Sequence, residues 1–378
     1  MSGFSKIKEF ITVSLGDVIG TAISSVFWIY LATQIEPAQY GEIHYFLGIV
    51  GVISFVVTIG TRDTIIVYVS KKIHIQSTFY FISIISAIIA SSIIMLIFYR
   101  ADASLLLIGY VINILAIGEL LGKKFYAAYS KYVLVQKTLT LVLGLGFFFI
   151  FGYEGVLYAL AASYVAFTII IYKGFRETKI DFSLLKPRMT FILHNYSVQV
   201  IGGFAGQIDK IIIVPILGFA LLGNYSLALV MVNVMLMFSH IVFKYLLPQD
   251  ARGEDTQKIK LNVVFVSVGI ALLGIIFLPM VIPEFFPKFT DVVDIIQLMS
   301  VGVIIKTATS VYESKFLGLE KSKFTLIATI LHLIAMVIGM IIMGLSFGIV
   351  GLAYAFILAN SIKLSFCIFA DRILLNAK

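Results

Sequence analysis

Long apolar blocks alternate with short polar segments along the whole of this chain. A helix needs about 20 mostly apolar residues to cross a hydrocarbon core about 30 Å thick. Because most of the blocks reach that length, the pattern predicts membrane-spanning helices rather than strands. We expect twelve, at residues 9–32, 42–60, 77–98, 103–122, 132–152, 154–173, 191–217, 221–247, 261–283, 293–313, 323–344 and 348–370.

Composition supports the same setting. Of the 378 residues, 60% are hydrophobic and 13% are charged, and the mean hydropathy is +1.06. A soluble domain carries about 25% charged residues. We therefore expect an all-α integral membrane protein. Asp17 interrupts the first apolar run and no small-residue cleavage site follows, so we expect this run to stay as a membrane helix.

The basic residues predict the orientation. With both termini cytoplasmic, Arg100 and Lys288 lie on the outer side of the membrane, and Lys210 and Lys306 lie within expected spans. The other 24 of the 28 Lys and Arg then lie on the cytoplasmic side if both termini are cytoplasmic. Short loops that alternate in this way follow the positive-inside rule. The net charge of +8 is thus explained by topology in a cell (plasma) membrane, and we expect no nucleic-acid partner.

An internal repeat divides the chain. The segment from Asp17 to Glu42 aligns without a gap with the segment from Gln199 to Asn224, so that Val-Ile-Gly meets Val-Ile-Gly. A second echo aligns GVLYALAA at 155 with GIVGLAYA at 348. Six helices per half is an even number, which implies a parallel pseudo-two-fold repeat, an architecture typical of transporters. We expect six-helix bundles at 1–173 and 191–378, joined by a cytoplasmic linker at 174–190.

Polar residues follow one face of several expected spans. At three- and four-residue steps such residues share a helix face, and amides or charges on four helices predict a hydrated central cavity. The candidate cavity residues are Trp28, Asn195, Gln199, Lys210, Asn233 and Lys306, and the acidic candidates are Asp17, Asp209 and Glu313. A single hydroxyl in such a helix is more often packing between helices.

Charges at mid-membrane cost at least about 2.5–3.5 kcal/mol on insertion scales, so they usually face a cavity or a partner. Adjacent residues on a helix point in different directions. We therefore expect Lys210 to face the cavity and Asp209 to face a neighbouring helix, with snorkelling as the alternative. Lys306 lies mid-span. Asp17 could pair with Lys306, or bind a cation or proton.

Arg62 and Asp63 are expected to end the second span at the cytoplasmic face. An arginine there can snorkel, or it can bind a phosphate group through its planar guanidinium. The sequence contains no phosphate-binding glycine loop, metal-ligand spacing or paired catalytic carboxylates, so we expect no enzyme, metal or cofactor. The single Cys367 excludes a disulfide framework within the chain.

Three stretches resemble polysaccharide-biosynthesis flippases of the Wzx type. In the segment 14–72, Tyr40-Gly41 follows a polar first helix, and Gly60 and Arg62 end the next one. In the segment 207–229, an acidic residue precedes an apolar run and the turn Gly223-Asn224-Tyr225. The segment 286–300, FPKFTDVVDIIQLMS, resembles the entry into the family's tenth helix.

The resemblance implies the fold of the multidrug/oligosaccharidyl-lipid/polysaccharide exporter superfamily, with two bundles forming a V around a central cavity. It also implies a flippase that moves a polyprenyl-phosphate- or pyrophosphate-linked oligosaccharide to the outer leaflet by alternating access. Lys306, Lys210 and Arg62 suit the diphosphate, and Na⁺ or H⁺ coupling is a candidate at Asp17, with Asp209 and Glu313 as further acidic candidates. Membrane lipids and a polysaccharide polymerase or glycosyltransferases are the other candidate partners.

Two alternatives stay open. A cation-coupled multidrug exporter of the same superfamily would prefer an acidic cavity, whereas this one is expected to be basic. A non-transporting scaffold for glycan assembly need not place lysines in its interior. Both alternatives are therefore disfavoured by the same residues, Lys210 and Lys306.

Overall fold

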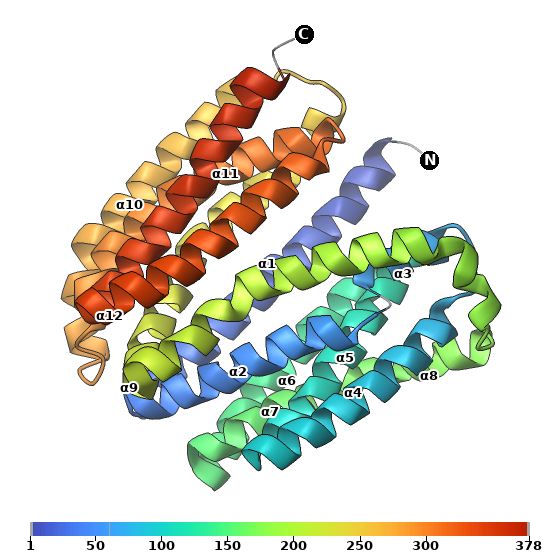
Figure 1. The fold of residues 1–378 in the computed structure, drawn as a ribbon, viewed down its shortest axis with the longest axis horizontal. Helices are drawn as coiled ribbons and strands as arrows, with labels where there is room; N and C mark the ends of the chain where they lie inside the picture. The colour runs from blue at the N-terminus through green and yellow to red at the C-terminus, as the bar shows by residue number, and fades with distance from the viewer. Residues whose placement is uncertain (1–2, 60, 376–378) are drawn as a thin grey trace. The chain divides into compact units, whose positions relative to one another are not determined.

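The computed structural model describes residues 3–59 and 61–375, and it describes their side chains except at residues 3–11, 244, 248, 251 and 373–375. Gly60, part of the motif at the second span, lies outside the described residues. Helices are the only regular elements in these ranges (Figure 1). Helices are expected because hydrocarbon offers the backbone no hydrogen-bonding partner, and a helix pairs its backbone groups within itself.

Nine helical stretches among the described residues are long and apolar enough to cross a membrane. The chain is therefore a multi-pass membrane protein. The long helices are α1 (Gly3–Gln34), α2 (Pro37–Val57), α4 (Gln76–Phe98), α5 (Ala101–Gly122), α6 (Tyr126–Phe151), α9 (Met189–Ala251), α10 (Gln257–Phe285), α11 (Val292–Gly318) and α12 (Ser322–Phe369). Shorter helices are α3 (Arg62–Ser70), α7 (Gly155–Ser163) and α8 (Thr168–Glu177).

Three of the nine stretches are longer than one crossing requires. They are Tyr126–Glu177, Phe182–Leu247 and Ser322–Arg372, with 52, 66 and 51 residues. Each is broken by a glycine with positive φ: Gly152 (70°) after α6, Gly218 (84°) within α9 and Gly348 (58°) within α12. Other residues adopt such angles only at a steric cost. In Figure 1 the two halves of α12 run side by side. All twelve expected ranges are largely helical, and the three glycine breaks fall at the boundaries between expected ranges that the nine stretches join.

The second expected span ends earlier than its sequence suggests. Helix α2 ends at Val57, and Arg62 and Asp63 instead begin the short helix α3. The Thr61 side chain accepts a hydrogen bond from the backbone N–H of Thr64, which caps this new helix. The expectation that Arg62 and Asp63 end the second span is thus wrong, because a local cap starts a separate helix there.

The described chain forms two compact units. Unit 1 contains the residues up to Phe27 and Phe46–Gln207, and unit 2 contains Trp28–Tyr45 and Ile208–Lys378. The end of α1 and the start of α2 therefore pack in unit 2, and the first part of α9 packs in unit 1. The expected division into bundles at 1–173 and 191–378 stays a prediction about the internal repeat.

Unit 1 holds a buried carboxylate between three helices. Glu119 of α5 is 1% exposed; it accepts a hydrogen bond from the Tyr80 hydroxyl of α4 and lies 2.5 Å from the Lys123 amine. Lys123 also pairs with Glu177 of α8. A buried carboxylate is costly unless it is paired and hydrogen-bonded, so these contacts join α4, α5 and α8.

Two glycines meet in unit 2 at equivalent positions of the repeat. A Cβ on Gly41 would lie 1.9 Å from the carbonyl oxygen of Phe219, and a Cβ on Gly223 would lie 1.9 Å from that of Pro37. Both Gly41 and Gly223, and Pro37 and Phe219, are 182 residues apart, as in the alignment of the repeat. Such reciprocal contacts are those of a two-fold axis. Within unit 2, the start of α2 and the middle of α9 are therefore related by an approximate local two-fold between Gly41 and Gly223.

The second echo of the repeat has a different register from the expected one. Gly155 and Gly351 each approach a carbonyl oxygen eight positions earlier in the chain, those of Phe147 and Met343. Gly152 and Gly348 share positive φ. Gly155 therefore corresponds to Gly351 rather than to Gly348. The backbone geometry at the two turns shows which glycines correspond. The short match of apolar residues alone does not.

Candidate functional site

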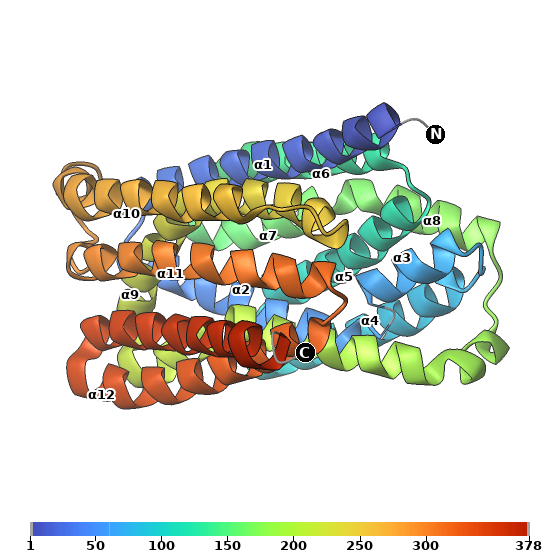
Figure 2. The same cartoon turned by 90° about the horizontal axis from the view of Figure 1, so that it is seen from above.

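Unit 2 gathers charged side chains from three membrane helices. Asp209 and Lys210 lie on α9, Lys306 and Glu313 on α11, and Lys363 on α12. The helices α10, α11 and α12 lie next to one another in both Figure 1 and Figure 2. Lys306 lies within electrostatic range of Asp209, Glu313 and Lys363, and Lys210 lies within range of Asp209. We call Asp209, Lys210, Lys306, Glu313 and Lys363 the charged cluster.

The adjacent pair on α9 divides between two environments. Asp209 is 8% exposed, its carboxylate accepts a hydrogen bond of 2.9 Å from the backbone N–H of Lys210, and it lies beside the buried Tyr225. Lys210 is half-buried and lies within electrostatic reach of His44 on α2. The Asp209 side chain is thus enclosed by the protein, whereas part of the Lys210 side chain is accessible.

Lys306 rests on an aromatic ring. Its amine lies 5.5 Å from the centre of the Phe356 ring of α12, a cation–π contact. Among the described residues, no carboxylate lies within ion-pair distance of this amine. A ring neutralises a cation less completely than a carboxylate does, so Lys306 keeps the capacity to bind an anion.

Glu313 has a direct partner that the sequence analysis missed. Its carboxylate lies 2.8 Å from the amine of Lys363, and both side chains are about one-fifth exposed, at 20% and 19%. Lys363 falls inside the expected span 348–370, near its cytoplasmic end. Helix α12 continues past it to Phe369, and the expected place of Lys363 on the cytoplasmic side stays a prediction. The available signal was a lysine in the middle of an apolar run.

An aromatic group stands at the end of α1 in unit 2. The Trp28 ring lies 4.8 Å from the ring of His44 and 6.1 Å from that of Tyr40, centre to centre. Both nitrogens of His44 are buried without a hydrogen-bond partner. Trp28 itself is half-buried, so part of its ring is accessible.

Unit 1 holds the other acidic candidate. The Tyr129 hydroxyl of α6 donates a hydrogen bond of 2.6 Å to the Asp17 carboxylate. Lys137, also on α6, lies within electrostatic reach of Asp17 and inside the expected span 132–152. Its expected place on the cytoplasmic side likewise stays a prediction. The expected pairing of Asp17 with Lys306 stays a prediction.

The remaining candidates are spread over the two units. Arg62 in unit 1 is 55% exposed and pairs with Asp63 at 3.4 Å. Asn195 donates to the carbonyl of Phe191 at 2.9 Å, and one buried atom of Gln199, Nε2, has no partner. In unit 2, Asn233 is exposed.

No family model matches this sequence, and no curated protein matches it significantly. Solved structures do match. A multidrug resistance MATE family transporter of the MOP superfamily in an inward-facing conformation is 14% identical, with a TM-score of 0.74, and 95% of each chain is covered. Lipid II flippase MurJ in an inward closed conformation is also 14% identical, with a TM-score of 0.75, over 96% of this chain and 87% of that one.

A third match is a MOP superfamily transporter from Pyrococcus furiosus, described as having a binding pocket of reverse polarity. It is 16% identical, with a TM-score of 0.63, over 96% of this chain and 93% of that one. At these identities the likeness concerns the fold. The chain therefore has the fold of the MOP superfamily transporters.

Proposed function

We propose that this chain is a flippase of the Wzx type, which moves a polyprenyl-phosphate- or pyrophosphate-linked oligosaccharide from the cytoplasmic to the outer leaflet for cell-surface polysaccharide synthesis. The observation that carries the proposal is the excess of cations in the charged cluster. Three lysines (Lys210, Lys306 and Lys363) face two carboxylates (Asp209 and Glu313) within membrane helices of one unit.

An excess of positive charge within membrane helices suits a phosphate group. Charge-assisted hydrogen bonds to phosphate are about twice as strong as neutral ones, and they strengthen further where water is scarce. Lys363 is matched by Glu313 at 2.8 Å, so the phosphate is expected to approach Lys306. Lys210 is a second contact and Arg62 of unit 1 a candidate for the first encounter.

The sugar part of the substrate needs polar and aromatic neighbours. Amides donate to and accept from hydroxyl groups, and an indole presents a large apolar face. Trp28, Asn233, Asn195 and Gln199 are the candidates for these contacts. The lipid chain stays in the bilayer while the headgroup crosses.

Transport would proceed by alternating access of two related halves, for which the reciprocal contact of Gly41 and Gly223 provides a natural axis. Coupling to Na⁺ or H⁺ would use Asp17 or Asp209. Glu313 is the weaker candidate because its carboxylate already pairs with Lys363.

Reconstitution tests this proposal. A fluorescent polyprenyl-diphosphate oligosaccharide is incorporated into proteoliposomes, and the accessibility of its headgroup is followed with and without an ion gradient. We expect Lys306→Ala to lower the flipping rate at least about ten-fold, since an ion contact to phosphate contributes more than 1.4 kcal/mol. Lys321→Ala, at an exposed position before α12, is the matched control and should keep the normal rate.

The second candidate is a cation-coupled multidrug exporter. It is favoured by the match to a multidrug resistance MATE family transporter and by the acidic groups Asp17 and Asp209 in membrane helices. Gradient-driven efflux of organic cations, together with no flipping of any lipid-linked oligosaccharide, would establish this candidate and overturn the flippase proposal.

A further inference from the structure

A cavity of about 610 Å³ lies in unit 2, and the residues that line it do not include those of the charged cluster. Its walls come from the first part of α10, the second half of α11 and the end of α12. Residues 253–256, between α9 and α10, close one end. The lining residues used below are Asp250, Glu254, Asp255, Lys260, Leu261, Val264, Val311, Lys315, Leu364, Ile368 and Asp371. We call this cavity the α10–α12 groove.

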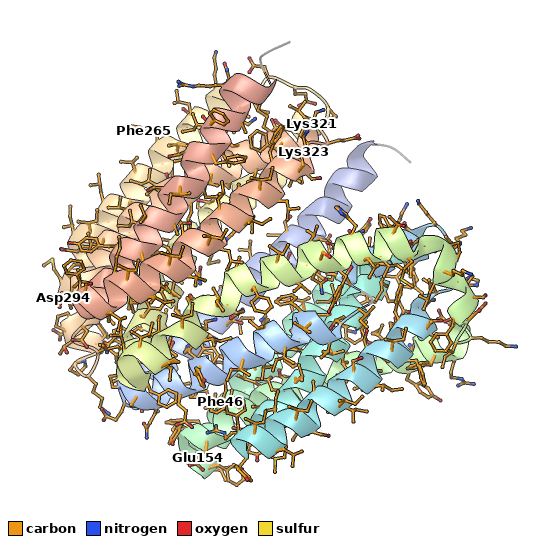
Figure 3. The ribbon with its side chains drawn as sticks, viewed as in Figure 1. Phe46, Glu154, Phe265, Asp294, Lys321 and Lys323 are labelled. Atoms are coloured by element: carbon orange, nitrogen blue, oxygen red, sulfur yellow. The ribbon has the colours of Figure 1, made fainter. Side chains whose placement is uncertain are left out.

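One side of the groove is apolar. Leu261 and Val264 of α10 face it together with Val311 of α11 and with Leu364 and Ile368 of α12. Leu261 is 73% exposed and Phe265, one turn further along α10, is 78% exposed, as its outward position in Figure 3 shows. Large apolar side chains at such exposure on a membrane-length helix are those that lipid covers. The apolar side of the groove is therefore continuous with a lipid-facing surface.

The other end of the groove is charged, and two ion pairs are built into it. The Lys260 amine lies 2.6 Å from the Asp250 carboxylate, which also accepts hydrogen bonds from Thr256 and Ser314 at 2.7 Å each. The Lys315 amine lies 2.5 Å from the Asp371 carboxylate. These pairs neutralise both lysines of the lining.

Two more carboxylates line the same end. Asp255 is exposed, and its carboxylate accepts a hydrogen bond of 3.1 Å from the backbone N–H of Gln257. Glu254 lies 2.9 Å from Arg252, in a pair that is half-exposed or more on both sides. With four carboxylates, two lysines and the adjacent Arg252, this end of the groove has a formal charge of −1.

We propose that the α10–α12 groove binds an aminophospholipid, with its acyl chains along Leu261, Val264 and Ile368 and its ammonium group at Asp255 and Glu254. The volume suits a headgroup and the first part of the chains, since pockets of 300–1,000 Å³ hold drug-sized ligands.

Charge selects this class over other lipids. An anionic phospholipid would add a negative charge to an end that already carries one in excess, and like charges repel. A quaternary choline headgroup has no N–H to donate to Asp255, whereas a primary ammonium donates three hydrogen bonds. The groove should therefore prefer ethanolamine over choline and over glycerol headgroups.

The full chain in detergent, titrated with lipids that share the same acyl chains, tests the site by native mass spectrometry. We expect phosphatidylethanolamine to be retained about five-fold more than phosphatidylglycerol, as one charge-assisted hydrogen bond would give. The double variant Glu254→Gln/Asp255→Asn should lose this preference. Asp63→Asn, a carboxylate 67% exposed on α3, is the control and should keep it.

Equal or stronger retention of phosphatidylglycerol would overturn the proposal, as would an unchanged preference in the double variant. Displacement by an alkyltrimethylammonium ion, with no preference among lipids, would assign the groove to soluble organic cations instead and so overturn the lipid. The assay measures binding and not flipping, so its failure leaves the proposed transport function standing and can be told apart from it.

Discussion

Lys363 and Glu313 illustrate how single residues set the character of the charged cluster. A charge left without its partner in a membrane helix is more costly than the pair, because the surroundings offer little solvation. The pair removes one lysine and one carboxylate from the cluster. Two lysines and Asp209 remain, which leaves an excess of one positive charge.

Breaking this pair should destabilise the protein. We expect Glu313→Gln or Lys363→Gln alone to cost about 3 kcal/mol, the lower end of values for removing one partner of a buried pair. The double variant Glu313→Gln/Lys363→Gln should recover most of that loss. Thermal unfolding of the purified protein in detergent measures the three values, and additive losses would contradict a direct interaction.

A residue-scale prediction also follows for Asp17. In Tyr129→Phe the carboxylate loses the hydrogen bond of 2.6 Å from α6. If Asp17 binds the coupling ion, the flipping rate should change its dependence on the ion gradient, while gradient-free exchange stays within about two-fold, a difference below 0.5 kcal/mol. The proteoliposome assay measures both. An unchanged gradient dependence would assign Asp17 a structural role.

At the scale of helices, the close approach of α2 and α9 rests on the absence of two side chains. We expect Gly41→Ala and Gly223→Ala each to cost about 1–3 kcal/mol, as overpacking does, because the added methyl would lie 1.9 Å from a carbonyl oxygen. The control Gly269→Ala lies in α10 with nothing within 4 Å of its Cβ and should be neutral or slightly stabilising. Midpoints of thermal unfolding compare the three.

Helix ranges were mostly predictable, and their ends were not. The ranges follow from the length of each apolar run, which is a local property of the sequence. The end of α2 at Val57 and the start of α3 at Arg62 depend on a cap made by Thr61, which an apolar count does not register. The breaks at Gly218 and Gly348 likewise depend on backbone angles rather than on composition.

At the scale of the whole molecule, we expect both termini to lie on the cytoplasmic side. We expect Glu254→Cys and Lys321→Cys, in a Cys367→Ser background, to react with a membrane-impermeant maleimide only from the cytoplasmic side. Glu154→Cys, next to the turn at Gly152 and labelled in Figure 3, should react from outside. Labelling of intact cells and of inverted vesicles compares the two sides, and the opposite result would reverse the topology.

The membrane setting, the approximate helix ranges and the 182-residue offset of the first repeat were determined by the sequence alone, because chain length, hydropathy and repetition are properties of consecutive residues. Only the tertiary structure decided that Glu313 pairs with Lys363, that Tyr129 donates to Asp17, and that the ends of α1 and α9 divide between two units. The physical reason is that these partners lie on different helices, many residues apart. Their contact depends on how the helices pack, and apolar runs of similar composition do not specify that packing.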